Sequence, residues 1–439
     1  IGVASIIPFM ALVGDMNQLQ QNTIIAQVYK ASGITSESHF VFLLGVGVLA
    51  MLFFAAMISM FTTWRLSMFA TVIGSEIADK LYTHYLKQSW LFHVSESSAQ
   101  LTKKIATEAV RVTSGILLPL MLMNARIVLS LLMSLSIFIY DPKVAIIGLI
   151  LFSTAYYIIF DVVQSRLEKN GATISEVVEK RFRLMNEGFG GIKDVLLLGR
   201  DKYFIKKFKK TGQQYAYSQG TNATLTSVPR YFMELVAFGS MIGLLLYLIA
   251  SHDGNLGIIL PILSVYALAT FKLLPAFQQI YASAAFIKSN IAAFQSIRQD
   301  LINSMQMKIL KNEPKRSYLR PKQKISLENI TFTYPNTDRP ILNQLNMSIP
   351  VNSVIGIVGP SGSGKSTVIN ILLGLLKLQY GQLKIDDINI DNQNRRSWQN
   401  TIGFVAQNIF LSEGTISENV AFGIPKNEIQ TQKVEQALK

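Results

Sequence analysis

The chain has 439 residues, 50% of them hydrophobic and only 15% charged, whereas about a quarter of a soluble protein is charged; this excludes a single soluble domain. The absence of cysteine from the sequence excludes disulfide bonds, cysteine-ligated zinc and thiol nucleophiles. The net charge of +14 is explained most simply by basic cytoplasmic loops of a membrane protein, so no nucleic-acid partner is expected.

Six membrane-spanning helices are predicted, and the first of them is partial. Ile1–Val13 is apolar but shorter than the about 20 helical residues that cross a bilayer, so we interpret it as the end of a span that begins earlier. Five uncharged or nearly uncharged segments of spanning length follow: Phe40–Met60, Ile116–Tyr140, Val144–Val163, Tyr231–Ile249 and Leu256–Ala282. Turn residues at 141–142 and 252–255 join two pairs of these spans.

Basic residues are distributed unequally between the two sides of this arrangement. Six Lys and Arg lie in residues 61–115 and thirteen in residues 164–230, whereas the opposite connections hold only Lys30 and Lys143. Cytoplasmic loops of membrane proteins collect positive charge, so the long segments and the C-terminal region are placed in the cytoplasm. The predicted location is therefore the cytoplasmic (inner) membrane, with a multi-pass topology.

The long basic segments have few helix breakers. Ser67–Trp90, Ala172–Leu198 and Asp201–Gln219 mix apolar and charged residues at helical spacing, which predicts helices that continue well beyond the membrane. On the other side, Met16–Lys30 is interpreted as either a short amphipathic helix or an ordinary loop. Composition divides the chain into a transmembrane domain (1–310), a charged linker (311–323) and a further domain (324–439).

A phosphate-binding motif opens the last domain. From Lys324 the pattern predicts short strands at Ile325–Tyr334, Leu345–Ile349 and Val354–Val358, followed by a helix at Val368–Leu376. Between the third strand and the helix, residues 359–367 fit the pattern G-x-x-x-x-G-K-[ST]. The nucleotide-binding residues that this motif assigns are Gly359, Ser361, Gly362, Ser363, Gly364, Lys365, Ser366 and Thr367.

The glycines of such a loop let main-chain amides face phosphate oxygens, and the following helix adds the positive end of its dipole. Lys365 would reach the β- and γ-phosphates of ATP, and the hydroxyl of Ser366 would hold Mg²⁺. The expected cofactors are therefore ATP and Mg²⁺.

With these residues in place, the whole chain resembles a half-transporter of the ABC exporter superfamily. The resemblance implies a multidomain fold: an all-α polytopic membrane domain of six helices, followed by the N-terminal half of an α/β P-loop nucleotide-binding domain. Phe332–Pro335 is similar to the family's adenine-stacking loop, and Phe404–Gln407 is similar to its Q-loop. The resemblance also implies that Tyr334 stacks on adenine and that Gln407 contacts Mg²⁺ and the γ-phosphate.

The same resemblance implies a limit on activity. Phe410–Gly423 is similar to the stretch that follows the Q-loop, so the signature motif, the Walker B aspartate, the catalytic glutamate and the switch histidine would follow Lys439. ATP hydrolysis, with Lys365 and Gln407 in the catalytic set, is expected of the full-length protein and not of these 439 residues alone. The family further implies pairing with a second copy, with a heterodimer as the alternative.

The substrate is predicted less directly. Glu187–Phe204 and Phe271–Ile280 resemble bacterial flippases of lipid-linked oligosaccharides. Arg126 and Lys272 lie within predicted spans, where a charge is costly unless it faces a water-filled cavity or a partner, and Arg230 lies near the cytoplasmic mouth. These three cations are the candidate site for a pyrophosphate-linked or similar anionic glycolipid.

Other interpretations remain at this point. The cations could extend toward the interface, or pair with Glu234 or Asp161. The alternative substrates are peptides, drugs or other lipids. An interpretation of another class is a membrane regulator that binds ATP without transporting anything.

Overall fold

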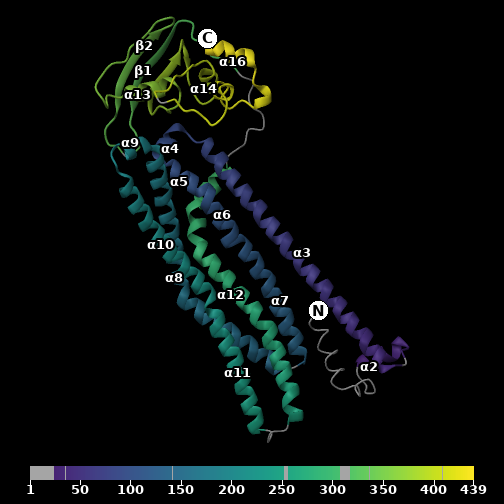
Figure 1. The fold of residues 1–439 in the computed structure, drawn as a ribbon. Coiled ribbons are helices and arrows are strands. Elements are labelled where there is room, and N and C mark those ends of the chain that lie inside the picture. Colours follow the sequence, from purple (N-terminus) through teal and green to yellow (C-terminus); the bar gives the residue numbers. More distant parts are fainter. Residues whose placement is uncertain are drawn as a thin grey trace. The chain divides into compact units, whose positions relative to one another are not determined.

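The computed structural model describes residues 24–34, 36–140, 142–251, 256–306, 317–335, 337–407 and 409–439. The chain divides into two compact units, one of residues 1–88 and 92–309 and the other of residues 310–439 together with 89–91. Figure 1 shows long helices in the first unit and a small sheet with short helices in the second. The expected partial span Ile1–Val13 lies outside the described residues.

The N-terminal part of the described chain is helical throughout. Its α-helices are α2 (Ile24–Ser32), α3 (Glu37–Leu86), α4 (Trp90–Ser95), α5 (Ser98–Lys103), α6 (Ala109–Val112), α7 (Leu118–Tyr140), α8 (Pro142–Gly190), α9 (Ile192–Leu197), α10 (Asp201–Ser227), α11 (Pro229–Ser251) and α12 (Leu256–Gln306). Two π-helical turns, at Lys104–Glu108 and Thr113–Leu117, join α5, α6 and α7 into one continuous helix. Each of the five complete spans predicted from the sequence lies inside one of these helical runs.

Several of these helices are much longer than a bilayer is thick. Within the described residues, four helical segments are long and apolar enough to cross a membrane. At 1.5 Å per residue, the 49 residues of α8 extend for about 74 Å, against about 30 Å of hydrocarbon. The predicted continuation beyond the membrane is thus confirmed, with breaks before α4 and at Gly191, where the sequence pattern predicted unbroken helices.

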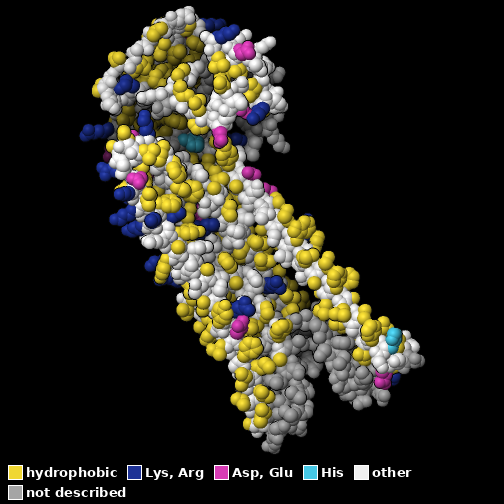
Figure 2. All heavy atoms as spheres, viewed as in Figure 1, with side chains coloured by type: hydrophobic (Ala, Val, Ile, Leu, Met, Phe, Trp, Pro, Cys, Tyr) yellow, Lys and Arg dark blue, Asp and Glu magenta, His cyan; other side chains and the backbone are white. Residues whose placement is uncertain are grey.

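Two apolar clusters hold the helices together. One joins α8, α11 and α12, with Phe152, Met233 and Leu273 almost fully buried. The other joins α3, α6 and α12 around Leu81 and Ile297. In contrast, most of the apolar side chains of α3 are exposed, and Figure 2 shows them along the length of that helix. A soluble monomer rarely exposes an apolar surface of this extent, but a lipid-facing helix does.

The second unit contains a four-stranded antiparallel sheet. Its strands are β1 (Lys324–Phe332), β2 (Leu342–Pro350), β3 (Tyr380–Ile385) and β4 (Ile388–Asn389), in the order β2-β1-β3-β4. In the central strand, Leu327, Ile330 and Phe332 are buried and form the core of the unit. This core receives one face of α13 (Lys365–Leu372) through Val368 and Ile371.

The remaining helices of this unit are short. They are α14 (Arg395–Gln399), α15 (Ile416–Val420) and α16 (Thr431–Leu438). Trp398 of α14 is buried, and its indole Nε1–H donates to the main-chain oxygen of Leu372 at 2.7 Å, which fixes the C-terminal end of α13.

The predicted strand at Val354–Val358 is wrong for this structure. The segment pairs with no strand among the described residues, and Val354 and Val358 are 101% and 92% exposed. A strand exists only where a neighbour completes its main-chain hydrogen bonds, so an apolar pattern alone does not produce one. The α13 prediction, Val368–Leu376, is also shifted: the helix starts at Lys365 and ends at Leu372, before Gly374.

Candidate functional site

The phosphate-binding loop precedes α13 directly. Gly362 and Gly364 have φ angles of +83° and +90°, a region that glycine enters without steric cost. At Gly364 a Cβ atom would lie 2.9 Å from a methyl carbon of Leu342 and 3.3 Å from the main-chain oxygen of Ile341. Glycine is therefore required here both by backbone conformation and by the close approach of β2.

Lys365 begins α13 and folds back over the loop. Its ammonium group donates hydrogen bonds to the main-chain oxygens of Gly359, at 2.8 Å, and Pro360, at 2.7 Å. Both oxygens belong to the loop itself, so the charge is held at its centre. An anionic ligand there would meet a positive group together with the N-terminal amides of a helix, a combination that favours phosphate.

The other loop positions differ in exposure. Ser361, Ser363 and Ser366 are exposed, whereas Thr367 is buried. An exposed hydroxyl at Ser366, in the first turn of α13, remains available to a ligand or ion. The predicted residues Gly359 to Thr367 thus form one continuous loop and helix start in the structure.

Tyr334 lies beside this helix start. Its ring packs edge-on against Phe332, with centroids 5.1 Å apart, and its hydroxyl lies 3.3 Å from Oγ1 of Thr367. Sequence reasoning assigned Tyr334 and Thr367 to the site separately and missed this contact. The predicted adenine-stacking residue is therefore attached to the phosphate-binding helix in the structure.

Replacing Tyr334 with alanine is expected to weaken ATP binding by about 5- to 150-fold, because stacking of a base on an aromatic ring contributes about 1–3 kcal/mol. Replacing it with phenylalanine keeps the ring and removes only the contact with Thr367, worth about 1 kcal/mol, so a loss of less than about 10-fold is expected. Titration of the full-length protein with a fluorescent ATP analogue measures both. Equal losses in the two variants would contradict a stacking role.

Gln407 is exposed, and its side chain makes no hydrogen bond within the described part of the chain. No contact there joins it to Lys365 or Ser366. Its role as a ligand of Mg²⁺ therefore stays a prediction.

The residues present fit Mg²⁺ only in combination with a nucleotide. No group of three or more Asp, Glu or His side chains capable of holding a metal occurs among the described residues. Mg²⁺ commonly binds through one or two protein oxygens, with phosphates and waters completing the octahedron. The hydroxyl of Ser366 is suited to such a minimal contribution.

The segment after Gln407 is ordered by a capping box. Thr415 Oγ1 accepts a hydrogen bond from the amide of Glu418, whose Oε2 accepts one from the amide of Thr415 at 2.7 Å. Lys426 lies 2.7 Å from the same carboxylate. The ammonium group of Lys426 and the hydrogen bonds from Thr415 lower the pKa of Glu418 to about 2.

Because the pKa of Glu418 is lowered by folding, its contribution to stability is present above its unfolded pKa of about 4.3 and is lost as the pH falls toward 2. We expect protection of the α15 amides from hydrogen exchange to fall between pH 5 and pH 3 in the full-length protein. Glu418→Gln should flatten this dependence and lower protection at pH 5. Glu413→Gln, an exposed neighbour, should behave as the parent; an identical loss in both variants would contradict the capping role.

The candidate substrate residues are placed separately. Arg126 lies on α7, exposed, and makes no ion pair or hydrogen bond with any described residue. Arg230 pairs with Glu234 at 2.8 Å on α11, and Asp161 accepts a hydrogen bond from Gln164. Neither acid therefore neutralises Arg126 here. Lys272 lies on α12, and its side chain is outside the described part of the structure.

The second unit also contains a cavity of about 220 Å³. Ile371, Leu376 and Asp391 are among its lining residues. It lies at the C-terminal end of α13, opposite to the phosphate-binding loop, so it is not the nucleotide site.

Two protein-family models match the chain. One, described as the ABC transporter transmembrane region, matches residues 5–273, and the other, described as ABC transporter, matches residues 342–439. The second match includes the whole loop from Gly359 to Thr367.

Several similar proteins share one name. The chain is 27% identical to an ATP-dependent lipid A-core flippase of Coxiella burnetii, over 82% of the chain and 60% of the relative. Flippases of the same name from Blochmanniella floridana and Escherichia coli K12 are 24% and 23% identical, over 82% and 78% of the chain and 61% and 58% of the relatives. The chain thus spans about 60% of the length of these relatives.

A solved structure has the same fold. A bacterial Atm1-family ABC exporter with ATP bound superposes with a TM-score of 0.72, over 99% of this chain and 75% of the exporter. Sequence identity is 16%, so this likeness concerns the fold alone.

Proposed function

Because the chain belongs to the ABC transporter family, as the transmembrane-region match over residues 5–273 demonstrates, we propose that it forms half of an ATP-driven exporter. The observation that carries the proposal is the loop from Gly359 to Thr367, with Lys365 at its centre, in one chain with an apolar helical unit of membrane-spanning length. Such a loop recognises the phosphates of ATP, and the helical unit provides the path through lipid.

In the proposed site, the loop amides and Lys365 bind the β- and γ-phosphates while Tyr334 stacks on adenine. Mg²⁺, held by Ser366 and Gln407, would neutralise phosphate charge during hydrolysis. Lys365 would leave the carbonyls of Gly359 and Pro360 to reach the nucleotide. Hydrolysis is proposed for the full-length protein.

We propose a lipid-linked oligosaccharide or a similar anionic glycolipid as the substrate. The guanidinium of Arg126, which pairs with no described residue, supports an anionic headgroup, because a charge within a span is retained where it meets a partner. Lys272 and Arg230 would add to the same site. The relatives named lipid A-core flippases support a lipid cargo. Exporters of peptides, drugs or other lipids remain the competing substrate classes.

The working unit is proposed to be a dimer of two such chains in the cytoplasmic membrane. One chain carries a single phosphate-binding loop and one helical membrane unit. Figure 2 shows Lys and Arg gathered over α8 to α10, and Lys202, Lys206 and Lys210 are exposed there, as expected of a cytoplasmic surface.

The test is transport by the full-length protein in liposomes. Fluorescent lipid-linked oligosaccharide, fluorescent lipid A-core and a panel of peptides and drugs would each be offered with ATP, with the Lys365→Ala variant as the control. We expect ATP-dependent movement of one or both glycolipids, measured by quenching of the label in one leaflet. Movement of peptides or drugs alone would contradict the glycolipid proposal, and ATP binding without any movement would favour a regulator.

A further inference from the structure

The helix from α5 to α7 is interrupted by two π-helical turns. The amide of Ala109 donates to the oxygen of Lys104, and the amide of Leu118 donates to the oxygen of Thr113, both five residues back. Each π turn accommodates one residue more than an α turn would. Such turns are rare, and they occur frequently at functional sites and at kinks.

The first π turn brings two opposite charges together. Lys103 and Glu108 are five residues apart, which is about 1.4 turns of an α-helix and would point them in different directions. Here Nζ of Lys103 lies 3.6 Å from Oε1 of Glu108. The side chain of Glu108 is 0% exposed and that of Lys103 is 5% exposed.

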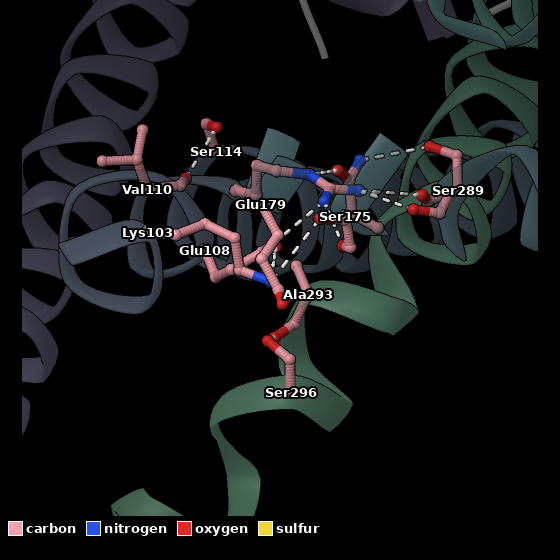
Figure 3. A network of polar contacts seen from close by, with 12 residues as sticks. Lys103, Glu108, Val110, Ser114, Ser175, Glu179, Ser289, Ala293 and Ser296 are labelled. Atoms are coloured by element: carbon pink, nitrogen blue, oxygen red, sulfur yellow. Dashed lines mark hydrogen bonds and ion pairs between the residues drawn. The ribbon is translucent and has the colours of Figure 1, made fainter. Parts of the chain in front are cut away.

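Arg111, the next charged residue, connects this pair to two other helices. Its guanidinium pairs with Glu108 at 2.9 Å and donates to Oγ of Ser175 on α8 at 2.6 Å and to Oδ1 of Asn290 on α12 at 3.1 Å. Lys103 reaches α8 as well, pairing with Glu179 at 3.0 Å. We call Lys103, Glu108, Arg111 and Glu179 the ion cluster. Figure 3 shows Lys103, Glu108, Glu179, Ser175 and Ser289 converging at this point.

A second set of contacts fixes the other side of the same turn. Lys104 pairs with Asp300 of α12 at 2.7 Å, and the same carboxylate accepts a hydrogen bond from the hydroxyl of Tyr85 on α3. Neighbouring residues 103 and 104 therefore tie the first π turn to α8 and α12 and, through Asp300, to α3. Rotating α5 about its axis would break both sets of contacts.

The ion cluster is neutral overall but not fully satisfied. It contains two cations and two anions, yet Oε1 of Glu108 is buried and makes no hydrogen bond within the described residues. A buried carboxylate without a complete set of partners is costly, and so is a π turn. The cost of the π turn has to be offset by contacts outside its own helix, and the cluster supplies such contacts to α8 and α12.

We propose that residues 103–117 have two registers and that the ion cluster holds the π register seen here. In the second register a π turn has relaxed to α geometry, so that α5 has rotated by about 100° and moved by about 1.5 Å, and Lys103 has left Glu108. Any role of the two registers in a transport cycle rests on the proposed function. The test of the two registers does not depend on transport.

The test uses Glu108→Gln in the full-length protein without nucleotide. Because these 439 residues contain no cysteine, single cysteines at the exposed positions Ser98 on α5 and Arg183 on α8 are the labelling sites within this part of the protein. Glu108→Gln keeps the shape of the side chain but removes the carboxylate partner of Arg111 and leaves Lys103 with Glu179 alone. We expect a second distance population between the labels, absent from the parent protein, as measured by double electron–electron resonance.

Glu176→Gln is the matched control. Glu176 pairs with Lys180 on α8 but is 65% exposed, so its loss should leave a single population. Deletion of Ala106 provides a second variant, because removing one residue from a π turn leaves an α turn. The deletion keeps α5 and α6 in the phase seen here, with Lys103 and Glu108 four residues apart on one face of an α-helix, so it should retain the single population of the parent protein.

The outcomes separate this inference from the proposed function. An unchanged single population in Glu108→Gln, a second population in the deletion variant, or equal broadening in Glu176→Gln would overturn the inference and leave the transport proposal intact. A second population in a protein that proves unable to hydrolyse ATP would support the inference and contradict the transport proposal.

Discussion

Lys365→Ala is expected to lower the ATPase activity of the full-length protein by about 10²- to 10³-fold, comparable to removal of one preorganised charge-stabilising group from an active site. ATP affinity should fall by about 10- to 150-fold, because a hydrogen bond to a charged group contributes about 1.5–3 kcal/mol. The structure gives the physical reason: the ammonium group is held over Gly359 and Pro360, where the loop would bind phosphate.

Lys377→Ala is the control for this variant. Lys377 is exposed and follows α13 on the side away from the loop, so its removal changes the net charge equally but not the site. Affinity from titration with an ATP analogue and turnover from phosphate release would both be measured. If Lys365→Ala bound ATP as tightly as Lys377→Ala, the loop would not be the phosphate site.

The second large effect is expected on replacing Arg126 and Lys272, the two basic residues within predicted membrane spans. Replacing both Arg126 and Lys272 with glutamine should abolish the stimulation of ATPase activity by an anionic glycolipid, because each hydrogen bond from a charged group contributes about 1.5–3 kcal/mol to substrate binding. Basal ATPase activity, measured without glycolipid, should stay within about 2-fold of the parent protein. Of the described residues, none neutralises Arg126, which leaves its charge to a ligand.

Two further variants make this test specific. Arg230→Gln should reduce stimulation less, because Arg230 is already paired with Glu234. Arg65→Gln removes an exposed arginine from α3 and should have no effect. Stimulation that survives in the Arg126 and Lys272 double variant would exclude these cations from substrate binding.

The sequence was most informative where local chemistry determines the structure. The pattern from Gly359 to Thr367 specified the loop and the start of α13, since positive φ angles and close backbone approach demand glycine. Apolar length likewise predicted that all five segments of spanning length are helical, because main-chain groups in lipid must be satisfied within a helix. The strand at Val354–Val358 failed because strand formation depends on a neighbour that no local pattern reveals.

The ion cluster could not have been predicted in the same way. Lys103, Lys104 and Arg111 counted simply as cytoplasmic positive charges, although all three lie in ion pairs or hydrogen bonds between helices. Lys103 lies five residues before Glu108, and Arg111 lies three residues after it. These spacings do not place the three side chains on one face of an α-helix. This mismatch is the feature of the sequence that could have indicated a π turn. A π turn is stabilised by contacts with other helices, so the periodicity of its own sequence does not predict it.

The length of α8 has a mechanical consequence. A helix of about 74 Å acts as a rigid lever arm, so a tilt of only about 5° at its membrane-embedded end displaces the far end by about 6 Å. Packing along α10 and α12 would carry neighbouring rods with it. Small rearrangements at one end of α8 can therefore produce displacements at the opposite end as large as the width of a side chain, and no flexible joint within α8 is needed.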